Sequence, residues 1–268
     1  MKKFYLALMC MASLTMMTAC GGDKKADKAD AEEENTEEVM NEDEQNAEAQ
    51  NAEAQDADEA DVWGDPAKAE VLNLAALYEA GDFKPATTTI FEDTLGGEAA
   101  GELPSKWDVA RGSAEIGEAA NCKYITMLGG DTELTPIVGN NSKNFLPEKY
   151  TMEFELMFGR DVWYWIYFFD AEEVECGNYH MWVGNAYWSF AKNDEEWIDG
   201  EKGELQNMLN RNGWNHFALS YDKGNLKIFI NGKRIANLPN IKQAAYFVIK
   251  GQDADGNSHF IRNIRVAK

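Results

Sequence analysis

The sequence predicts an all-β sandwich or barrel between about residue 85 and residue 268. Ten segments in this range alternate apolar and polar residues, or are rich in β-branched and aromatic residues, which is typical of strands. Turns containing glycine and asparagine separate them, among them DKGN, NGK and DADGN. Because no helical repeat interrupts the series, we expect the strands to pair with one another and to form a single β domain.

The N-terminus has the layout of a removable targeting segment. A lysine pair precedes an apolar stretch, residues 4–19, that is shorter than the ~20 residues a spanning helix needs. The end of this stretch and the cysteine that follows it, Met17-Thr18-Ala19-Cys20, resemble the lipobox of bacterial lipoproteins. The resemblance implies a signal peptide over 1–19 and acyl chains such as palmitate on Cys20, which would hold the protein in the bilayer of the outer membrane. A plain secretory signal is the alternative, and it gives Cys20 no role.

Residues 20–61 are predicted to be a lipidated, disordered acidic linker. Between residues 21 and 61 there are 17 acidic residues and 3 lysines, and QNAEA at 45–49 recurs at 50–54. Such a segment buries too little apolar surface to offset its chain entropy, and like-charge repulsion opposes the alternative of a transient helix. The mixture of lysine and acidic residues after Cys20 loosely resembles the export signals of surface-displayed lipoproteins. It therefore favours the cell surface over the periplasmic face.

The net negative charge of the chain argues against two kinds of binding partner, nucleic acids and anionic membrane surfaces. The chain has a formal net charge of −22, and residues 62–268 hold 30 acidic against 20 basic residues. An acidic domain repels phosphate backbones, so we do not expect nucleic acid as a partner. It also repels anionic membrane surfaces, so lipid rather than charge is expected to hold the protein at the membrane.

A short helix is predicted within residues 62–84, ahead of the β domain at 85–268. Asp65 suits the N-cap, Pro66 the first turn and Gly81 the stop. Its expected apolar face consists of Val71, Leu72, Ala75, Ala76 and Tyr78.

The segment DVWYWIYFFD, residues 161–170, is the best functional lead. Strand alternation puts Trp163, Trp165 and Tyr167 on one face, and their neighbours Tyr164, Ile166 and Phe168 on the other. Since both faces are apolar, we expect a central strand with one face in the core. The other face is a candidate platform for sugar rings, which Trp182 would join from a neighbouring strand. Tyr187, Trp188 and Trp197 are further candidates. The alternative is that a loop or the predicted helix covers these aromatic residues.

Residues 214–240, WNHFALSYDKGNLKIFINGKRIANLPN, resemble the paired strands of concanavalin A-like jelly-roll domains of the laminin-G and pentraxin type. The resemblance implies that Trp214 and Phe217 are core residues and that Asn231-Gly232 is a hairpin turn. Residues 91–116 resemble the start of such modules in bacterial surface proteins, and together the likeness covers about two-thirds of the chain. Some relatives carry the module ahead of an OmpA-like peptidoglycan-binding domain. Because this sequence stops after its last strand, we do not expect peptidoglycan anchoring.

We expect a noncatalytic envelope protein that binds carbohydrate or another surface ligand. A glycan-processing enzyme is the first alternative, because glycoside hydrolases on this fold place paired carboxylates on one strand. The nearest candidates are Asp170, Glu172, Glu173 and Glu175, but their order lacks the leading glutamate. The three histidines form no catalytic motif. A structural subunit of an envelope complex is the second alternative.

The sequence leaves two further features undecided, a calcium site and a disulfide. Laminin-G-like domains often bind Ca2+, and Asp253, Asp255 and Asn257 have loop spacing for it. Ile264 stands where an EF-hand needs glutamate, so the choice is between a looser site and a plain hairpin turn. Cys122 and Cys176 remain after removal of the signal peptide and lipidation of Cys20; either they pair outside the cytoplasm or they are separate thiols.

Overall fold

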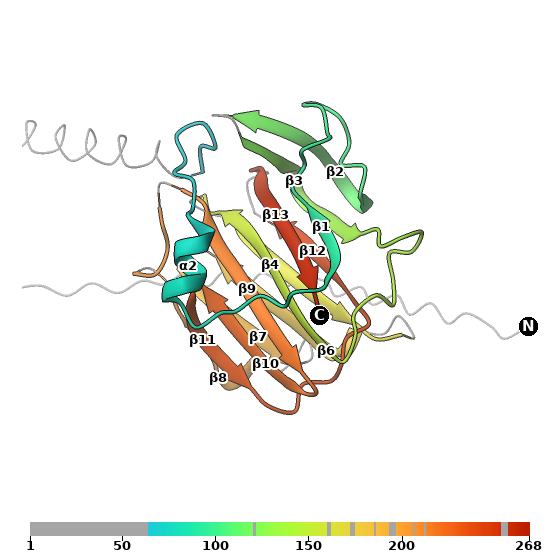
Figure 1. The fold of residues 1–268 in the computed structure, drawn as a ribbon, viewed down its shortest axis with the longest axis vertical. Coiled ribbons are helices and arrows are strands. Elements are labelled where there is room, and N and C mark those ends of the chain that lie inside the picture. The colour runs from blue at the N-terminus through green and yellow to red at the C-terminus, as the bar shows by residue number, and fades with distance from the viewer. Residues whose placement is uncertain are drawn as a thin grey trace, which may run out of the picture. The chain divides into compact units, whose positions relative to one another are not determined.

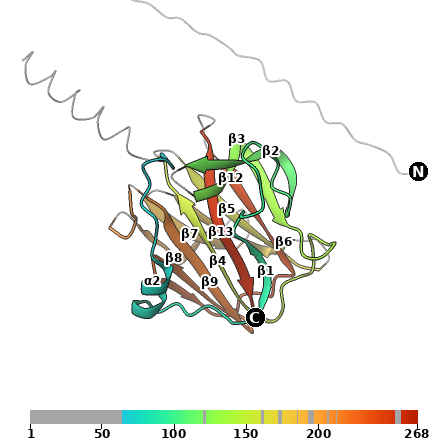
Figure 2. The ribbon, with the colours of Figure 1, turned by 45° about the horizontal axis from the view of Figure 1, so that its top comes forward.

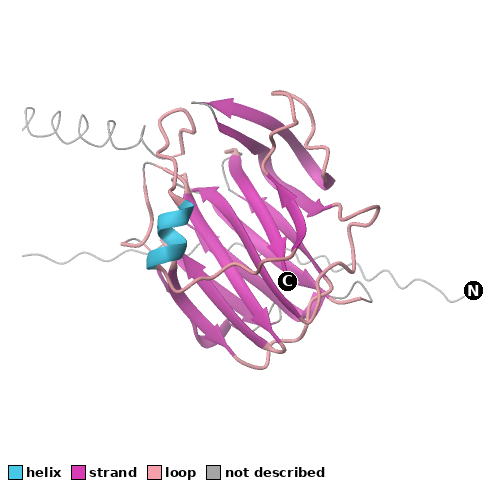
Figure 3. Ribbon diagram, viewed as in Figure 1, coloured by secondary structure: helices cyan, strands magenta, loops and turns pink. Residues whose placement is uncertain are grey.

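The computed structural model describes residues 64–119, 122–159, 162–171, 175–184, 186–192, 197–205, 207–211, 213–252 and 257–268. The chain divides into two units, Met1–Asn46 and Ala47–Lys268, and every described residue belongs to the second. The predicted signal peptide, Cys20 and the linker lie outside the described residues. The described part consists mainly of strands with one short helix (Figure 3). None of its helices is long and apolar enough to span a membrane.

Thirteen strands follow helix α2 (Leu74–Ala80) in the described part of the chain (Figure 1). They are β1 (Thr89–Asp93), β2 (Trp107–Ala119), β3 (Cys122–Pro136), β4 (Lys149–Met157), β5 (Trp163–Phe169), β6 (Glu175–Gly184), β7 (Tyr187–Lys192), β8 (Trp197–Glu204), β9 (Asn215–Asp222), β10 (Asn225–Ile230), β11 (Lys233–Leu238), β12 (Tyr246–Gln252) and β13 (His259–Ala267).

The strands form two layers joined through β3. Their hydrogen-bonded order is β11-β10-β9-β4-β13-β3-β12-β5-β6-β7-β8, with β1 beside β13 and β2 beside β3. The first half of β3 pairs with β13, through Ile125 and Ile261, and its second half pairs with β12, through Leu134 and Ile249. The long β2–β3 hairpin therefore connects the β4–β9–β13 layer to the β5–β6–β12 layer (Figure 2).

Residues with left-handed backbone conformations lie in the β2–β3 hairpin near the point where β3 changes its pairing from β13 to β12. Gly112, Gly129 and Asp131 have φ values of 73°, 71° and 79°, and the pairing register shifts on both sides of Arg111. A Cβ atom at Gly112 would lie 2.4 Å from Oγ1 of Thr132. Glycine is therefore required there both for its conformation and for the close approach of β3.

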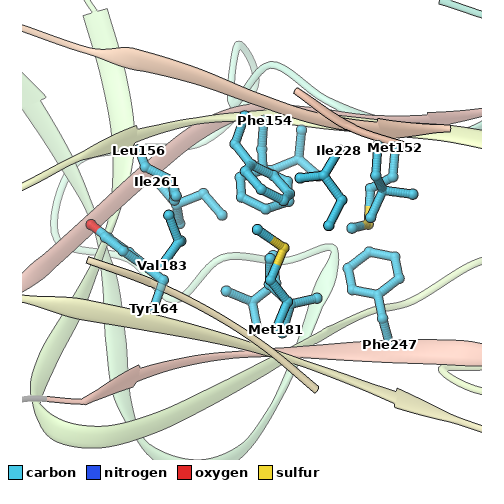
Figure 4. Packing of buried hydrophobic residues seen from close by; sticks show 14 of the residues in the cluster. Met152, Phe154, Leu156, Tyr164, Met181, Val183, Ile228, Phe247 and Ile261 are labelled. Atoms are coloured by element: carbon cyan, nitrogen blue, oxygen red, sulfur yellow. The ribbon is translucent and has the colours of Figure 1, made fainter. Parts of the chain in front are cut away.

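The core lies between the two layers, where inward side chains interdigitate. Phe154 and Ile261 from one layer face Met181, Val183 and Phe247 from the other (Figure 4), and all five are fully buried. The predicted alternation on β4 and β5 is confirmed, because every second residue of each strand enters this core.

The hairpin between β10 and β11 is confirmed as well. Asn231 and Gly232 both have positive φ, 45° and 77°, as a two-residue turn of this kind requires. Trp214 and Phe217 are both completely buried, in agreement with the resemblance to jelly-roll domains.

The helix is shorter than predicted, and its apolar face is different. It begins after Asn73, whose side chain accepts a hydrogen bond from the Ala76 amide at 3.1 Å. Asp65 caps only an isolated turn, by accepting from the amide of Ala67. Because the helical phase starts eight residues later than expected, Val71 is 66% exposed. Ala75 and Ala76 are exposed as well, whereas Tyr78 is half-buried as predicted and is joined by Leu74 and Leu77. Gly81 ends the helix as predicted.

Candidate functional site: an aromatic sheet face with an adjoining hollow

The four predicted ligand-binding residues lie together on the outer face of the β5–β6 pair. Trp163, Trp165 and Tyr167 are half-buried, whereas the residues between them on β5 are buried in the core. Trp182 on β6 is directly opposite Trp165 in the register, so the two indoles are on the same face. The rings of Trp165 and Tyr167 are stacked, with centroids 5.9 Å apart and planes inclined by 12°.

Gly184 provides the space in which two of these indoles meet. A Cβ atom at this position would lie 2.6 Å from Cδ1 of Trp163 and 3.4 Å from Cζ2 of Trp182. The glycine therefore lets both rings lie close over the end of β6. The result is a continuous aromatic surface rather than separate side chains.

A hollow of about 520 Å³ adjoins this surface over β6, β7 and β8, within the size range of small-molecule sites. Trp182 belongs to both the aromatic surface and the hollow, and Tyr187 is 49% exposed beside it. Gly203 leaves room for Trp188, whose Nε1 would lie 2.6 Å from a Cβ atom there. The other lining residues are Ser189, Lys202 and Glu204.

The contribution of β8 to this hollow was not predicted by any pattern in the sequence. The segment WIDGEKGE is rich in acidic residues and glycine, which are poor strand formers. Its register places Lys202 opposite Ser189 and Glu204 opposite Tyr187. No local pattern indicates these pairings, because they depend on how β8 adds to the edge of the sheet.

On the other side of the aromatic surface, β12 contributes an ion pair. Lys250 is the cross-strand neighbour of Trp165, and its Nζ lies 2.7 Å from Oδ1 of Asp131. Nη2 of Arg111 lies 3.3 Å from the other oxygen of Asp131. The hydrogen bond from Lys250 and its charge hold the pKa of Asp131 below its usual range.

Helix α2 does not cover the aromatic surface. It lies beside β9 in both views (Figures 1 and 2), and the Tyr78 hydroxyl donates to Oε2 of Glu153 on β4 at 2.5 Å. Phe83, just after the helix, packs on Phe229 of β10 and on His216 of β9, with centroids 5.3 and 5.7 Å away. The predicted alternative of a helical cover over the tryptophans is therefore wrong, because the helix belongs to the opposite layer.

The contacts of α2 include Glu153, which is one of two buried carboxylates that the sequence did not indicate as a pair. Glu153 and Glu155 occupy alternate positions on β4 and face away from the core between the sheets. Glu153 lies 3.0 Å from His216 Nε2 and 3.3 Å from Arg265 Nη1. Burial would raise the pKa of Glu153, but hydrogen bonds from His216 and Tyr78 outweigh it and leave the pKa below its usual range.

Glu155 is held in the same way. It accepts hydrogen bonds from Nε of Arg262 at 2.8 Å and from the side-chain Nδ2 of Asn263 at 2.7 Å. Both glutamates are thus acceptors in ion pairs, an arrangement that suits a structural role better than acid–base catalysis.

The carboxylates that the sequence offered for catalysis lie elsewhere. Asp170 forms an ion pair with Lys242 at 2.8 Å. Glu172 and Glu173 lie outside the described residues, as does the side chain of Glu175. The candidate carboxylates therefore form no described cluster with the aromatic surface.

The predicted calcium loop also falls largely outside the described residues. Asp253 and Asp255 belong to an undescribed segment, and Asn257 is exposed. Within the described part of the chain, no group of three or more His, Cys, Asp or Glu residues is arranged to hold a metal ion. The calcium site stays a prediction.

Cys122 is a free cysteine in the structure. Its Sγ lies 3.0 Å from the carbonyl oxygen of Ala119, at the end of the β2–β3 hairpin. The side chain of Cys176 lies outside the described residues. Whether the two cysteines pair or remain separate thiols therefore stays open, as the sequence left it.

Comparison with known proteins agrees with the fold. Residues 130–261 match the family model of the concanavalin A-like lectin/glucanases superfamily. Similar solved structures include an endo-acting O-glycanase from the human gut microbiota, with 10% identity and a TM-score of 0.49 over 67% of this chain and 99% of that chain. The carbohydrate-binding module CBM66 from Bacillus subtilis has 12% identity and a TM-score of 0.41 over 61% and 96%. β-Agarase A from Zobellia galactanivorans has 12% identity and a TM-score of 0.43 over 65% and 88%.

No curated protein matches the sequence. At 10–12% identity the structural likenesses concern the fold alone. The two-layer strand order and the family match over residues 130–261 together establish the fold class that the sequence predicted. The described domain is a concanavalin-like jelly-roll β-sandwich.

Proposed function

We propose that this protein is a lipid-anchored, noncatalytic envelope protein whose sandwich binds carbohydrate on the outer face of β5, β6 and β7. The observation that carries the proposal is the hollow of about 520 Å³ beside the Trp165–Trp182 pair. Aromatic faces next to polar groups suit sugar rings, which present both C–H surfaces and hydroxyl groups.

A glycan array tests the binding function. The full chain, solubilised in detergent and applied with and without Ca2+, is expected to bind a defined set of glycans. Replacement of Trp182 by alanine should weaken that binding at least tenfold, whereas Leu103→Ala, at a residue 67% exposed on another part of the domain, should not change it. Equal binding by Trp182→Ala and the parent would refute this assignment. Release of reducing sugar that depends on Glu172 or Glu173 would favour the enzymatic alternative.

The anchor needs a separate test, because it concerns the N-terminal segment. Cells fed a labelled palmitate analogue should label the protein, and Cys20→Ser should abolish the label and leave the protein outside the membrane fraction. Accessibility of the domain to protease on intact cells distinguishes the cell surface, which we favour, from the periplasmic face. Unchanged labelling of Cys20→Ser would refute lipidation at this residue.

A further inference from the structure

Ser189 stands out among the residues that line the hollow. It is only 4% exposed, and the register puts it on the same face as Trp182 of β6 and Lys202 of β8. Among the residues that the structure describes, its Oγ has no hydrogen-bond partner. A buried hydroxyl without a partner is costly, and such groups in native proteins usually have a functional explanation.

The charges around the hollow are balanced or negative. Lys250 is neutralised by Asp131, and its side chain is only 13% exposed. Lys202 is exposed, but Glu204 is exposed two residues away on the same face of β8. Residues 62–268 as a whole hold 30 acidic against 20 basic residues.

This charge pattern discriminates between classes of polysaccharide. A polymer of uronates or sulfated sugars would bring repeated negative charge close to an acidic domain. Among the described residues that line the hollow, the exposed Lys202 is matched by the exposed Glu204, so no net positive charge is available to hold such a polymer within the screening distance of about 8 Å at physiological salt. A hydroxyl group, in contrast, both donates and accepts hydrogen bonds, as does the serine hydroxyl.

We infer that the hollow binds an uncharged sugar ring, stacked on Trp182 and Tyr187, with one ring hydroxyl hydrogen-bonded to Oγ of Ser189. The inference rests on the proposed carbohydrate-binding function and specifies its substrate class. Ser189 supplies the polar contact and the two aromatic rings supply the apolar surface. Lys202 and Glu204 flank the ring without selecting for charge.

Affinity electrophoresis of the full chain in detergent tests the substrate class directly. Gels are cast with neutral polymers (a β-glucan, a galactan and a mannan), with anionic polymers (polygalacturonate and chondroitin sulfate) or with cationic chitosan. We expect retardation by at least one neutral polymer and none by the anionic or cationic polymers. The dissociation constant for the neutral polymer should change less than twofold between 50 and 500 mM NaCl, because no ion pair forms.

Ser189→Ala separates a ligand contact from a structural one. It should weaken binding of the neutral polymer about tenfold while leaving the unfolding temperature unchanged or raised, because it removes a buried unpaired hydroxyl. Ser113→Ala, at an exposed residue of β2 outside the hollow, is the control and should bind like the parent.

The possible results point in different directions. Parental affinity in Ser189→Ala would overturn the role of this hydroxyl. Two results would overturn the inference that the ligand is uncharged and would leave carbohydrate binding intact. One is salt-sensitive retention by an anionic polymer that is lost in Lys202→Ala. The other is preferential retention by chitosan. Absence of retardation by every polymer would overturn the proposed function and this inference together.

Discussion

Glu153 connects helix α2 to the sandwich through its hydrogen bond with Tyr78. Replacement of Glu153 should therefore destabilise the domain strongly. The side chain is 5% exposed and faces three partners: the Tyr78 hydroxyl at 2.5 Å, His216 Nε2 at 3.0 Å and Arg265 Nη1 at 3.3 Å. Glu153→Ala leaves His216 buried, and Tyr78 and Arg265 half-buried, each with one partner fewer. Loss of one member of a buried charge pair costs about 3–5 kcal/mol. For a domain of this size that corresponds to a fall of roughly 10 °C in Tm.

Glu92→Ala is the matched control. Glu92 also lies near Arg265, at 3.8 Å, but its side chain is 52% exposed, so its removal should cost less than about 1 kcal/mol. Urea unfolding followed by tryptophan fluorescence measures both variants. A difference of less than 1 kcal/mol between Glu153→Ala and Glu92→Ala would refute the reasoning.

The effect of Glu153 should also depend on pH in a specific direction. Because its folded pKa is lowered, the ionised form stabilises the fold above the ordinary carboxyl pKa of about 4.3, and this contribution is lost as the pH falls through the folded pKa. The gap in stability between the parent and Glu153→Ala should therefore narrow as the pH falls below about 4. A gap that widens in acid would contradict the assignment.

Three further perturbations test the fold. Tyr164→Phe removes a buried hydroxyl that accepts from the Phe260 amide at 3.0 Å, so we expect a loss of about 1–3 kcal/mol in urea unfolding. Gly112→Ala introduces a Cβ atom 2.4 Å from Thr132 Oγ1 at a φ of 73°, and it should lower Tm by several degrees; a neutral result would show that the β2–β3 bend adapts freely. Phe154→Ala opens the centre of the core and should cost about 3–5 kcal/mol by calorimetry, whereas a cost under 1 kcal/mol would mean that the two sheets close over the gap.

The acidic β8 strand and the start of the helix show where sequence analysis failed. In β8, glycine and acidic residues have low strand propensity, and pairing with β7 overrides that preference. At the helix, Asp65-Pro66 is a strong local start signal, but Asn73 caps the actual first turn. Tyr78 then reaches Glu153 and His216, contacts that lie far apart in the sequence and that no local signal contains.

Strand side chains alternate with a period of two, so the sequence specifies which residues share a face. It therefore placed Trp163, Trp165 and Tyr167 on one side of β5, and it located the Asn231-Gly232 turn from local backbone preference. The tertiary structure alone decided which strands are neighbours and which face is covered. The strand register places Trp182 opposite Trp165, and it places Ser189 in the lining of the hollow. Helix α2 packs on the other layer. These outcomes depend on pairing between distant segments, and that is a property of the assembled sheets rather than of any local pattern.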